Sequence, residues 1–240
     1  MRWSVVIPVK RLPEAKSRLR GDAGAGGDAG GGAGAGGGSA PASPAPDSPV
    51  ADLALAFALD TVSAARESPG VDRVLVVSSD ATVAREVTAI GGVVVADPGG
   101  GLNAAVGGGV AAALAVAPKA GVAVLTGDLP SLLPADLGAA LAAAALHPRA
   151  VVPDHLGTGT TLLTARPGES LDPRFGVDSR SRHENAGHEV LDIALGSSVR
   201  WDVDTPADLD RAAQHGTGRH TARALAERTG AHAARHRPRD

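Results

Sequence analysis

Short apolar runs alternate along this chain with longer segments whose apolar residues are spaced as on one face of a helix. The runs of Val, Leu, Ile and Ala predict buried strands at Trp3–Val9, Val71–Ser78, Val93–Ala96, Gly121–Thr126, Ala150–Pro153 and Ser198–Val203. The segments between them predict helices at Ala51–Glu67, Ala81–Ile90, Leu102–Val116, Pro134–Leu146 and Thr205–Ala213. This alternation is typical of a doubly wound, mostly parallel α/β sheet, which binds its ligand beyond the carboxyl ends of the strands.

Three segments do not follow this pattern. Residues Gly21–Pro49 are almost pure Gly and Ala, then Ser, Pro and Ala, and we expect a disordered insertion there because such a composition buries too little apolar surface to order itself. Residues Asp154–Gly187 are loop-rich and predict a lid or an antiparallel excursion over the sheet edge. Residues 214–240 form a polar tail rich in Arg and His, which we expect to be frayed. We therefore expect a single domain over residues 1–213.

Composition narrows the classes of function. The 240 residues include no cysteine, which excludes disulfides, a thiolate nucleophile and cysteine-bound metals, and fits a cytoplasmic protein. A net charge of -3 argues against a protein built mainly to bind nucleic acid, and no apolar run reaches the length of about 20 residues that a membrane-spanning helix needs. With aromatic residues at 2%, the core must be built from Ala, Val and Leu. The composition does not distinguish a monomer from a homodimer.

A basic loop follows the first predicted strand and contains Lys10, Arg11, Lys16, Arg18 and Arg20. Cations that gather at the carboxyl end of a strand suit a triphosphate or another polyanion. The alternative is a solvated basic loop. The segment matches neither a P-loop nor the Gly-x-Gly-x-x-Gly fingerprint, which disfavours both of those nucleotide-binding folds.

Aspartates follow two of the predicted strands. Asp128 comes directly after a buried Val-Leu strand, where its carboxylate and the phosphates of a substrate can share a hard cation. Alternation along the predicted strand Ser198–Val203 places Asp202 and Asp204 on the side opposite Val203, so that one of them can complete a two-aspartate metal site. The alternative is that Asp128 and Asp204 cap the helices that follow them.

Glycines and hydroxyl residues cluster in two segments of the loop-rich region, Gly157–Thr161 and Arg174–Ser179. Exposed N–H and O–H donors suit a small phosphorylated or carboxylated acceptor. The alternative is a pair of ordinary turns.

Taken together and in this order, six groups of residues resemble the 2-phospho-L-lactate/phosphoenolpyruvate guanylyltransferase family of coenzyme F-420 biosynthesis. They are Ile7–Lys10 with Ala15–Leu19, Gly101–Ala105, Gly127–Pro130, Gly157–Thr161, Phe175–Ser179 and Asp202–Pro206. The resemblance spans about Trp3 to Ala213, and the chain departs from the family pattern in its long insertion after Arg20. It implies a nucleotide-diphospho-sugar transferase (GT-A-like) fold and transfer of GMP from GTP to a three-carbon phosphorylated acid, with release of diphosphate.

The resemblance also implies roles for individual residues. Asp128 and Asp204 would hold Mg²⁺, with Asp202 as the alternative to Asp204, and Lys16 and Asp128 would be catalytic. The resemblance implies that two further sets of residues bind the substrates. The nucleotide would be bound by Pro8, Lys10, Lys16, Leu102 and Asn103, and the acceptor by Thr160, Thr161, Gly176 and Ser179. The residues do not distinguish phosphoenolpyruvate from 2-phospho-L-lactate. A related nucleotidyltransferase with another base or acceptor, and a non-catalytic nucleotide-binding protein, remain as alternatives.

Overall fold

The computed structural model describes residues 1–10 and 49–235, so that Lys16 and all of the expected insertion except Pro49 lie outside the described residues. The described strands are β1 (Trp3–Pro8), β2 (Val71–Val77), β3 (Val93–Val95), β4 (Gly121–Leu125), β5 (Arg149–Pro153), β6 (Thr160–Ala165) and β7 (Glu189–Val190). The described helices are α1 (Pro49–Glu67), α2 (Ala81–Ala89), α3 (Leu102–Val116), α4 (Pro134–Ala144), α5 (Ser179–Asn185), the 3-10 helix η3 (Ser198–Arg200), α6 (Pro206–His215) and α7 (Arg219–Arg235). Within this described part, no helix combines the length and the apolar character needed to cross a lipid bilayer.

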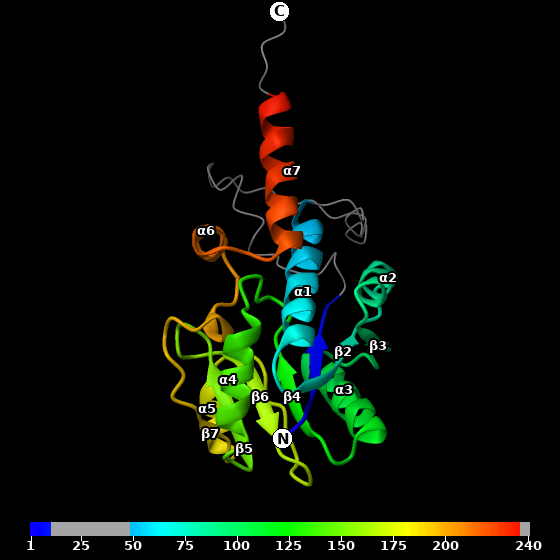
Figure 1. Cartoon of the computed structure of the whole chain (residues 1–240), viewed down its shortest axis with the longest axis vertical. Helices are drawn as coiled ribbons and strands as arrows, with labels where there is room; N and C mark the ends of the chain where they lie inside the picture. The colour runs from blue at the N-terminus through cyan, green and yellow to red at the C-terminus, as the bar shows by residue number, and fades with distance from the viewer. Residues whose placement is uncertain (11–48, 236–240) are drawn as a thin grey trace, which may run out of the picture.

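These strands form one sheet in the order β3-β2-β1-β4-β6-β5-β7, with helices on both faces (Figure 1). Alternation along β1 illustrates the two layers of core: Val5 and Ile7 pack with α1 and α4, whereas Val6 packs with α3. Every strand and helix predicted between Trp3 and Pro153 is present, with ends that agree to within one or two residues. The predicted doubly wound α/β domain is thus confirmed.

The region Asp154–Gly187 is not an excursion over the sheet edge, because it contributes β6 to the middle of the sheet. This strand lies between β4 and β5 and is antiparallel to both. All six of its residues are buried, and the hydroxyls of Thr161 and Thr164 reach backbone carbonyls of β5 at 3.4 and 3.3 Å. The three threonines give the segment a polar appearance in the sequence, although the sheet satisfies two of these hydroxyls internally.

The strand predicted at Ser198–Val203 is not formed. Residues 198–200 make the 3-10 helix η3, whose start is held by side chains: Asp136 Oδ2 accepts from both the N–H and the hydroxyl of Ser198 at 2.7 Å. Arg200 donates to the carbonyls of Asp154 and Ile193, at 2.9 and 3.0 Å. Side-chain hydrogen bonds therefore take the place of a strand ladder, and Asp202 and Asp204 do not share one side of a strand as predicted.

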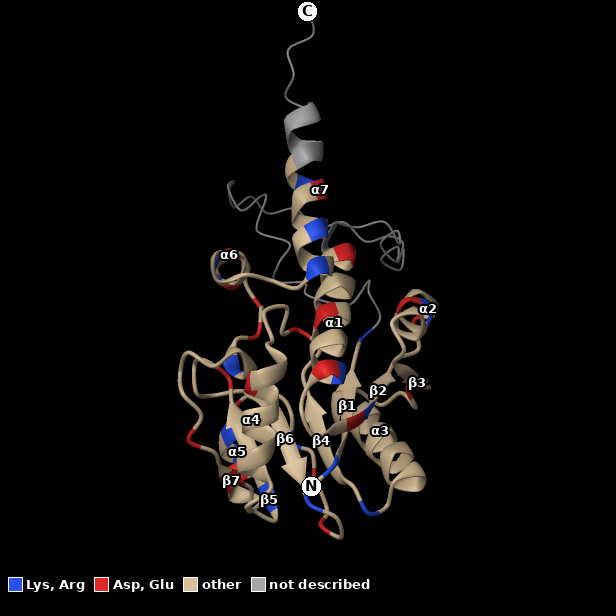
Figure 2. Ribbon diagram, viewed as in Figure 1, with Lys and Arg blue, Asp and Glu red and all other residues tan. Residues whose placement is uncertain are grey.

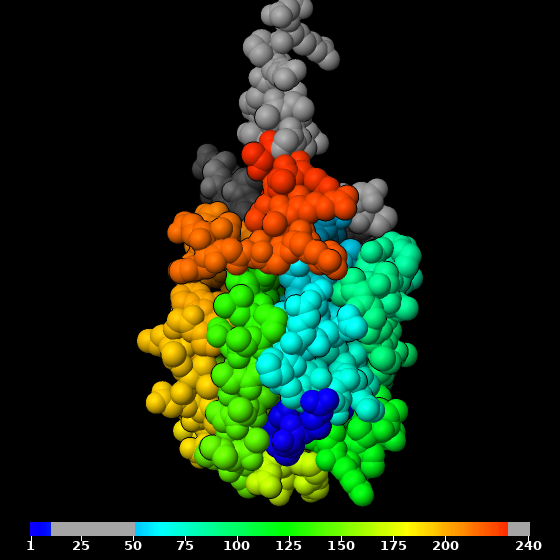
Figure 3. Space-filling view, viewed as in Figure 1, coloured from blue at the N-terminus to red at the C-terminus, as the bar shows by residue number. Residues whose placement is uncertain are grey.

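The tail predicted to be frayed instead contains an ordered helix, α7, which packs beside α1 (Figures 1 and 3). Its first turn is capped from within the core, because the buried Asp60 of α1 accepts from His220 N and Thr221 N at 3.0 and 2.8 Å. Gly218 precedes the helix at a point where an added Cβ would lie 2.3 Å from Asp60 Cγ, so only glycine fits. A carboxylate that accepts the unpaired N–H groups of a helix start stabilises that helix.

Replacing Asp60 by alanine should therefore lower the free energy of unfolding by about 2 kcal/mol, since two charged hydrogen bonds and a helix cap are lost together. Chemical denaturation of the full chain measures this change. Asp52→Ala is the matched control, because Asp52 is an exposed residue of the same helix. Equal stability of the two variants would contradict the assignment of Asp60 as the anchor of α7.

Candidate functional site

The sheet brings functional side chains from distant parts of the sequence to one edge. Strands β1, β2 and β4 are parallel and end there, and β6, which is antiparallel to β4 and β5, begins there. Lys10 follows β1, Asp128 follows β4, Asp154 follows β5, and Thr160 opens β6. This edge is where a doubly wound sheet binds its ligand.

A pocket of about 580 Å³ opens at this edge between the ends of β1 and β2 and the loop that leads into α3. That loop turns through Gly99, Gly100 and Gly101, all with positive φ (79°, 84° and 90°), a conformation that favours glycine. The pocket is lined by Pro8, Val9, Lys10, Val77, Ser79, Asp97, Pro98, Gly99, Gly101, Leu102 and Ala105. Its volume is that of a small-ligand site, and it unites three of the residues predicted to contact a nucleotide.

Asn103, the fourth described residue of the predicted nucleotide set, has a different environment. Its side-chain amide donates to the carbonyl of Phe175 at 3.1 Å and accepts from the N–H of Phe175 at 2.8 Å. Both ends of the amide are therefore engaged by the segment that carries Gly176. Asn103 joins the pocket loop to the predicted acceptor segment.

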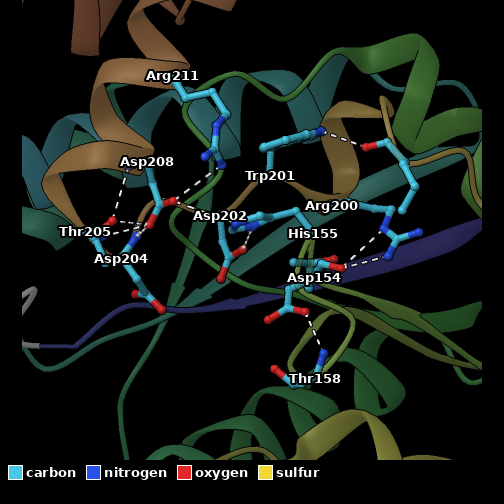
Figure 4. A network of polar contacts seen from close by, with 12 residues as sticks. Asp154, His155, Thr158, Arg200, Trp201, Asp202, Asp204, Thr205, Asp208 and Arg211 are labelled. Atoms are coloured by element: carbon cyan, nitrogen blue, oxygen red, sulfur yellow. Dashed lines mark hydrogen bonds and ion pairs between the residues drawn. The ribbon is translucent and has the colours of Figure 1, made fainter.

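Asp128, Asp154, Asp202 and Asp204 are close enough for their charges to interact, beyond the ends of β4 and β5. Figure 4 labels the last three of them, and Figure 2 colours all acidic residues of the ribbon red. The N–H of Val203 donates to the carbonyl of Asp128 at 3.0 Å, which brings the segment that carries Asp202 and Asp204 against the loop after β4. Burial raises the pKa of Asp202 well above its ordinary value, and the negative charges of Asp128, Asp204 and Asp154 raise it further. The Oδ1 atom of Asp202 is buried and accepts no hydrogen bond. Such a concentration of carboxylates is a site where a cation would be stabilised.

The loop that carries Asp128 is held from two further elements. Leu129 N donates to the buried hydroxyl of Thr61 in α1 at 3.1 Å, and Gly218 N, just before α7, donates to the carbonyl of Pro130 at 2.8 Å. The N-cap of α4 is Leu133, and that of α6 is Thr205. Neither Asp128 nor Asp204 is therefore the N-cap residue of the helix that follows it.

The described residues include no ready-made group of three or more His, Asp or Glu side chains placed to enclose a metal ion. A Mg²⁺ ion in a nucleotide site does not need one, because it commonly takes one or two carboxylates and completes its shell with phosphates and water. The carboxylates of Asp128, Asp202 and Asp204 are oxygen donors of the type that Mg²⁺ prefers. Their mutual repulsion and the unsatisfied Oδ1 of Asp202 fit a cation at this place.

Thr160 at the start of β6 and Ser179 at the start of α5 lie in one buried hydrogen-bond network. The N–H of Arg174 donates to His183 Nε2 at 2.9 Å, so the hydrogen of the neutral ring is on Nδ1, which lies 3.0 Å from Thr160 Oγ1. The hydroxyl of Ser179 donates to the same Oγ1 at 3.1 Å. Because Thr160 Oγ1 accepts two hydrogen bonds, its own hydrogen remains available to donate to a ligand.

His183 at the centre of this network is fully buried. Burial, followed by the nearby His188, lowers the pKa of His183 from 6.5 to about 4. The ring is therefore neutral at physiological pH, as the hydrogen bond from Arg174 N requires.

The other two predicted acceptor residues contribute no side chain to this network. The side chain of Thr161 is fully buried, and its hydroxyl donates to the carbonyl of Val152 in β5 at 3.4 Å, so it links two strands of the sheet. Gly176 is exposed, and its carbonyl accepts from Ser179 N at 3.1 Å.

The structure adds residues that sequence reasoning missed: Asp97, Asp154, His155, His183 and Arg200. Asp154 follows strand β5 as Asp128 follows β4, and this signal was present in the sequence. His183 lies in a segment interpreted as loop, and Arg200 in a segment interpreted as strand, so the sequence pattern gave no reason to select them.

Comparison with known proteins identifies the family. The family model of the MobA-like NTP transferase domain matches residues 53–233. A protein named phosphoenolpyruvate guanylyltransferase from Streptomyces coelicolor is 47% identical over 223 residues, which cover 92% of this chain and 95% of the relative. A protein of the same name from Salinispora arenicola is also 47% identical, covering 92% of each chain.

Solved structures agree on the fold. A protein assigned as a nucleotide-diphospho-sugar transferase from Desulfovibrio desulfuricans superimposes with a TM-score of 0.62 at 18% identity, covering 96% of both chains. A 4-diphosphocytidyl-2C-methyl-D-erythritol synthase gives 0.54 at 16% identity, covering 89% of this chain and 98% of that one. The predicted nucleotide-diphospho-sugar transferase fold is thus confirmed, and the chain is a nucleotidyltransferase that belongs to the phosphoenolpyruvate guanylyltransferase family.

Proposed function

We propose that this protein transfers the guanylyl group of GTP to phosphoenolpyruvate and releases diphosphate. The observation that carries the proposal is the arrangement at one sheet edge: a nucleoside-sized pocket at β1 and β2, a carboxylate cluster beyond β4 and β5, and a buried hydroxyl network at the start of β6. The names of relatives at 47% identity support the same substrates. On the family resemblance, we further propose that the reaction belongs to coenzyme F-420 biosynthesis.

In this proposal the pocket beside β1 and β2 binds the nucleoside. Its lining contains one carboxylate, that of Asp97, whose Oδ1 already accepts from Gly99 N at 2.9 Å. Guanine carries N–H donors on its Watson–Crick edge, which a carboxylate can accept. Lys10 lines the same pocket and offers its ammonium group to the phosphates. Lys16, outside the described residues, is proposed to act with it.

Asp128 and Asp204 are proposed to hold a Mg²⁺ ion, with Asp202 as the alternative second ligand. Bound Mg²⁺ would neutralise charge on the triphosphate and on the departing diphosphate. The carboxylates contribute by being fixed before the substrate binds, because the Val203–Asp128 hydrogen bond and the cap of α6 hold their backbones in place.

The acceptor is proposed to bind near Thr160, Gly176 and Ser179, with Thr161 supporting the strand. Thr160 has a hydroxyl hydrogen to donate to a phosphate or carboxylate oxygen, and Ser179 and His183 fix its direction. Thr160 and Ser179 are 6% and 2% exposed, so only a small part of either side chain is open to an acceptor.

The reaction needs no general base. A phosphate oxygen of phosphoenolpyruvate, already ionised at neutral pH, attacks the α-phosphorus of GTP in line. The bond from that phosphorus to the bridging oxygen breaks, and diphosphate leaves with the electron pair. The protein contributes positioning and charge neutralisation, which are the main sources of rate enhancement in such transfers.

Diphosphate release with each nucleoside triphosphate tests the proposal, measured with and without phosphoenolpyruvate, 2-phospho-L-lactate and phosphoglycerate. We expect release with GTP and phosphoenolpyruvate. Asp128→Ala should lower the rate of release by orders of magnitude. Asp72→Ala is the control and should retain activity, because Asp72 is an exposed residue of β2. Release with another triphosphate would identify a relative with different base specificity. No release from any pair would overturn the proposal in favour of a non-catalytic nucleotide-binding protein.

Ser179→Ala should raise the apparent KM for phosphoenolpyruvate about tenfold and leave the KM for GTP nearly unchanged, because it removes one of the two donors that orient Thr160. Steady-state kinetics with each substrate varied in turn measure this. An equal rise in both KM values would assign Ser179 a general structural role. A rise for GTP alone would contradict the acceptor assignment.

Acid should destabilise the fold through His183. Below about pH 6.5 the unfolded chain binds a proton that the folded ring takes up only near pH 4, so stability falls as the pH drops through this window. The contribution lost by pH 4 is about 3 kcal/mol. The free energy of unfolding, measured by denaturation at several pH values between 7 and 4, should therefore fall less steeply with decreasing pH for His183→Gln than for the wild type. The exposed control His215→Gln should behave like the wild type. Parallel pH profiles would contradict the role of His183.

A further inference from the structure

A histidine outside the predicted site lies between two carboxylates at its border (Figure 4). His155 Nδ1 is 3.5 Å from Asp202 Oδ1, and His155 Nε2 is 3.7 Å from Asp208 Oδ1. The three side chains are only 13%, 17% and 12% exposed, so solvent screens these contacts weakly. The two nitrogens of one ring thus face two acidic groups, one of which belongs to the carboxylate cluster.

Stacking fixes the orientation of this ring. His155 lies against Trp201 with ring centroids 4.9 Å apart and an interplanar angle of 11°. Trp201 is itself held, because its Nε1–H donates to the carbonyl of Leu195 at 3.0 Å. A ring held on a fixed aromatic plane keeps both nitrogens directed at their carboxylates.

Asp208 connects the ring to the segment that carries Asp204. Its Oδ2 accepts from Thr205 N at 2.9 Å, from Thr205 Oγ1 at 2.7 Å and from Asp204 N at 3.3 Å. Burial alone would raise the pKa of Asp208, but these hydrogen bonds lower it, so the group stays ionised. Its other oxygen faces His155 and the guanidinium of Arg211, each at 3.7 Å.

We propose that His155 is a positioning residue of the cation site: it holds the Asp202 carboxylate directly and, through Asp208, the turn that presents Asp204. The inference rests on the proposed cation site at Asp128 and Asp204. Apart from this 3.5 Å contact with His155, Asp202 Oδ1 is a buried oxygen that accepts no hydrogen bond, and it lies among the negative charges of its neighbours. The contact is therefore what can keep this carboxylate in one orientation. Partners of metal ligands commonly contribute 10- to 100-fold to metal affinity.

The substitution His155→Phe separates this role from packing. Phenylalanine retains an aromatic ring that can stack on Trp201 but removes both nitrogens. His215→Phe is the matched control, because His215 lies on the same tryptophan, 6.1 Å away between ring centroids, and is exposed at the end of α6. His155→Gln restores one donor toward the carboxylates.

Binding of Mn²⁺ alone to the full-length protein, followed by electron paramagnetic resonance without substrates, tests the proposal. We expect the dissociation constant for Mn²⁺ to rise at least tenfold in His155→Phe, to recover partly in His155→Gln, and to stay unchanged in His215→Phe. The melting temperature without metal should be the same for all four proteins.

Equal Mn²⁺ affinity in His155→Phe and the wild type would overturn the proposal, as would a wild type that binds no Mn²⁺. If His155→Phe melts early, His155→Gln decides: weaker Mn²⁺ binding at unchanged melting temperature supports a positioning role, and unchanged binding overturns it. The readout is independent of turnover. A wild type with His155-dependent Mn²⁺ binding but no diphosphate release would overturn the proposed function and leave this inference standing.

Discussion

The hydrogen bond from Val203 N–H to the carbonyl of Asp128 is the interaction on which the site depends. It joins the loop after β4 to the segment before α6 and so brings Asp128 beside Asp202 and Asp204. These carboxylates repel one another, and burial adds to the cost, as the raised pKa of Asp202 records. A backbone hydrogen bond can hold them together without a cation, so the proposed cation site would be formed before its ligand binds.

The rest of the molecule supports this contact. Thr61 of α1 and Gly218 at the start of α7 hold the residues just after Asp128, and Asp60 of α1 caps α7, so two helices far from the site in sequence fix the same loop. Asn103 ties the pocket loop to the segment of Gly176. The pocket beside β1 and β2, the carboxylate cluster and the hydroxyl network of Thr160 are therefore held in one relative arrangement, which suits the proposed reaction because its catalysis rests on positioning.

Much of this fold could be predicted from the sequence, because continuous apolar strands and capped helices are local patterns. The elements that were missed depend on distant partners: Thr161 and Thr164 become strand residues only where β5 accepts their hydroxyls, and residues 198–200 form a 3-10 helix because Asp136 binds Ser198. The α7 helix depends likewise on Asp60, about 160 residues away. Asp128 and Lys10 could be proposed from the sequence because they lie two or three residues after strands. The contacts of His155 and His183 are made only in three dimensions, so the sequence pattern offered no reason to propose these two residues.

The most direct test of the proposed cation site at Asp128, Asp202 and Asp204 is to locate the cation. Crystals of the protein grown with GTP and Mn²⁺, measured at the manganese absorption edge, give an anomalous signal at the ion itself. We expect one strong peak, within coordination distance of carboxylate oxygens of Asp128 and of Asp204 or Asp202, and of the triphosphate on the side of Lys10. A manganese ion bound to the triphosphate and away from all three aspartates would contradict it.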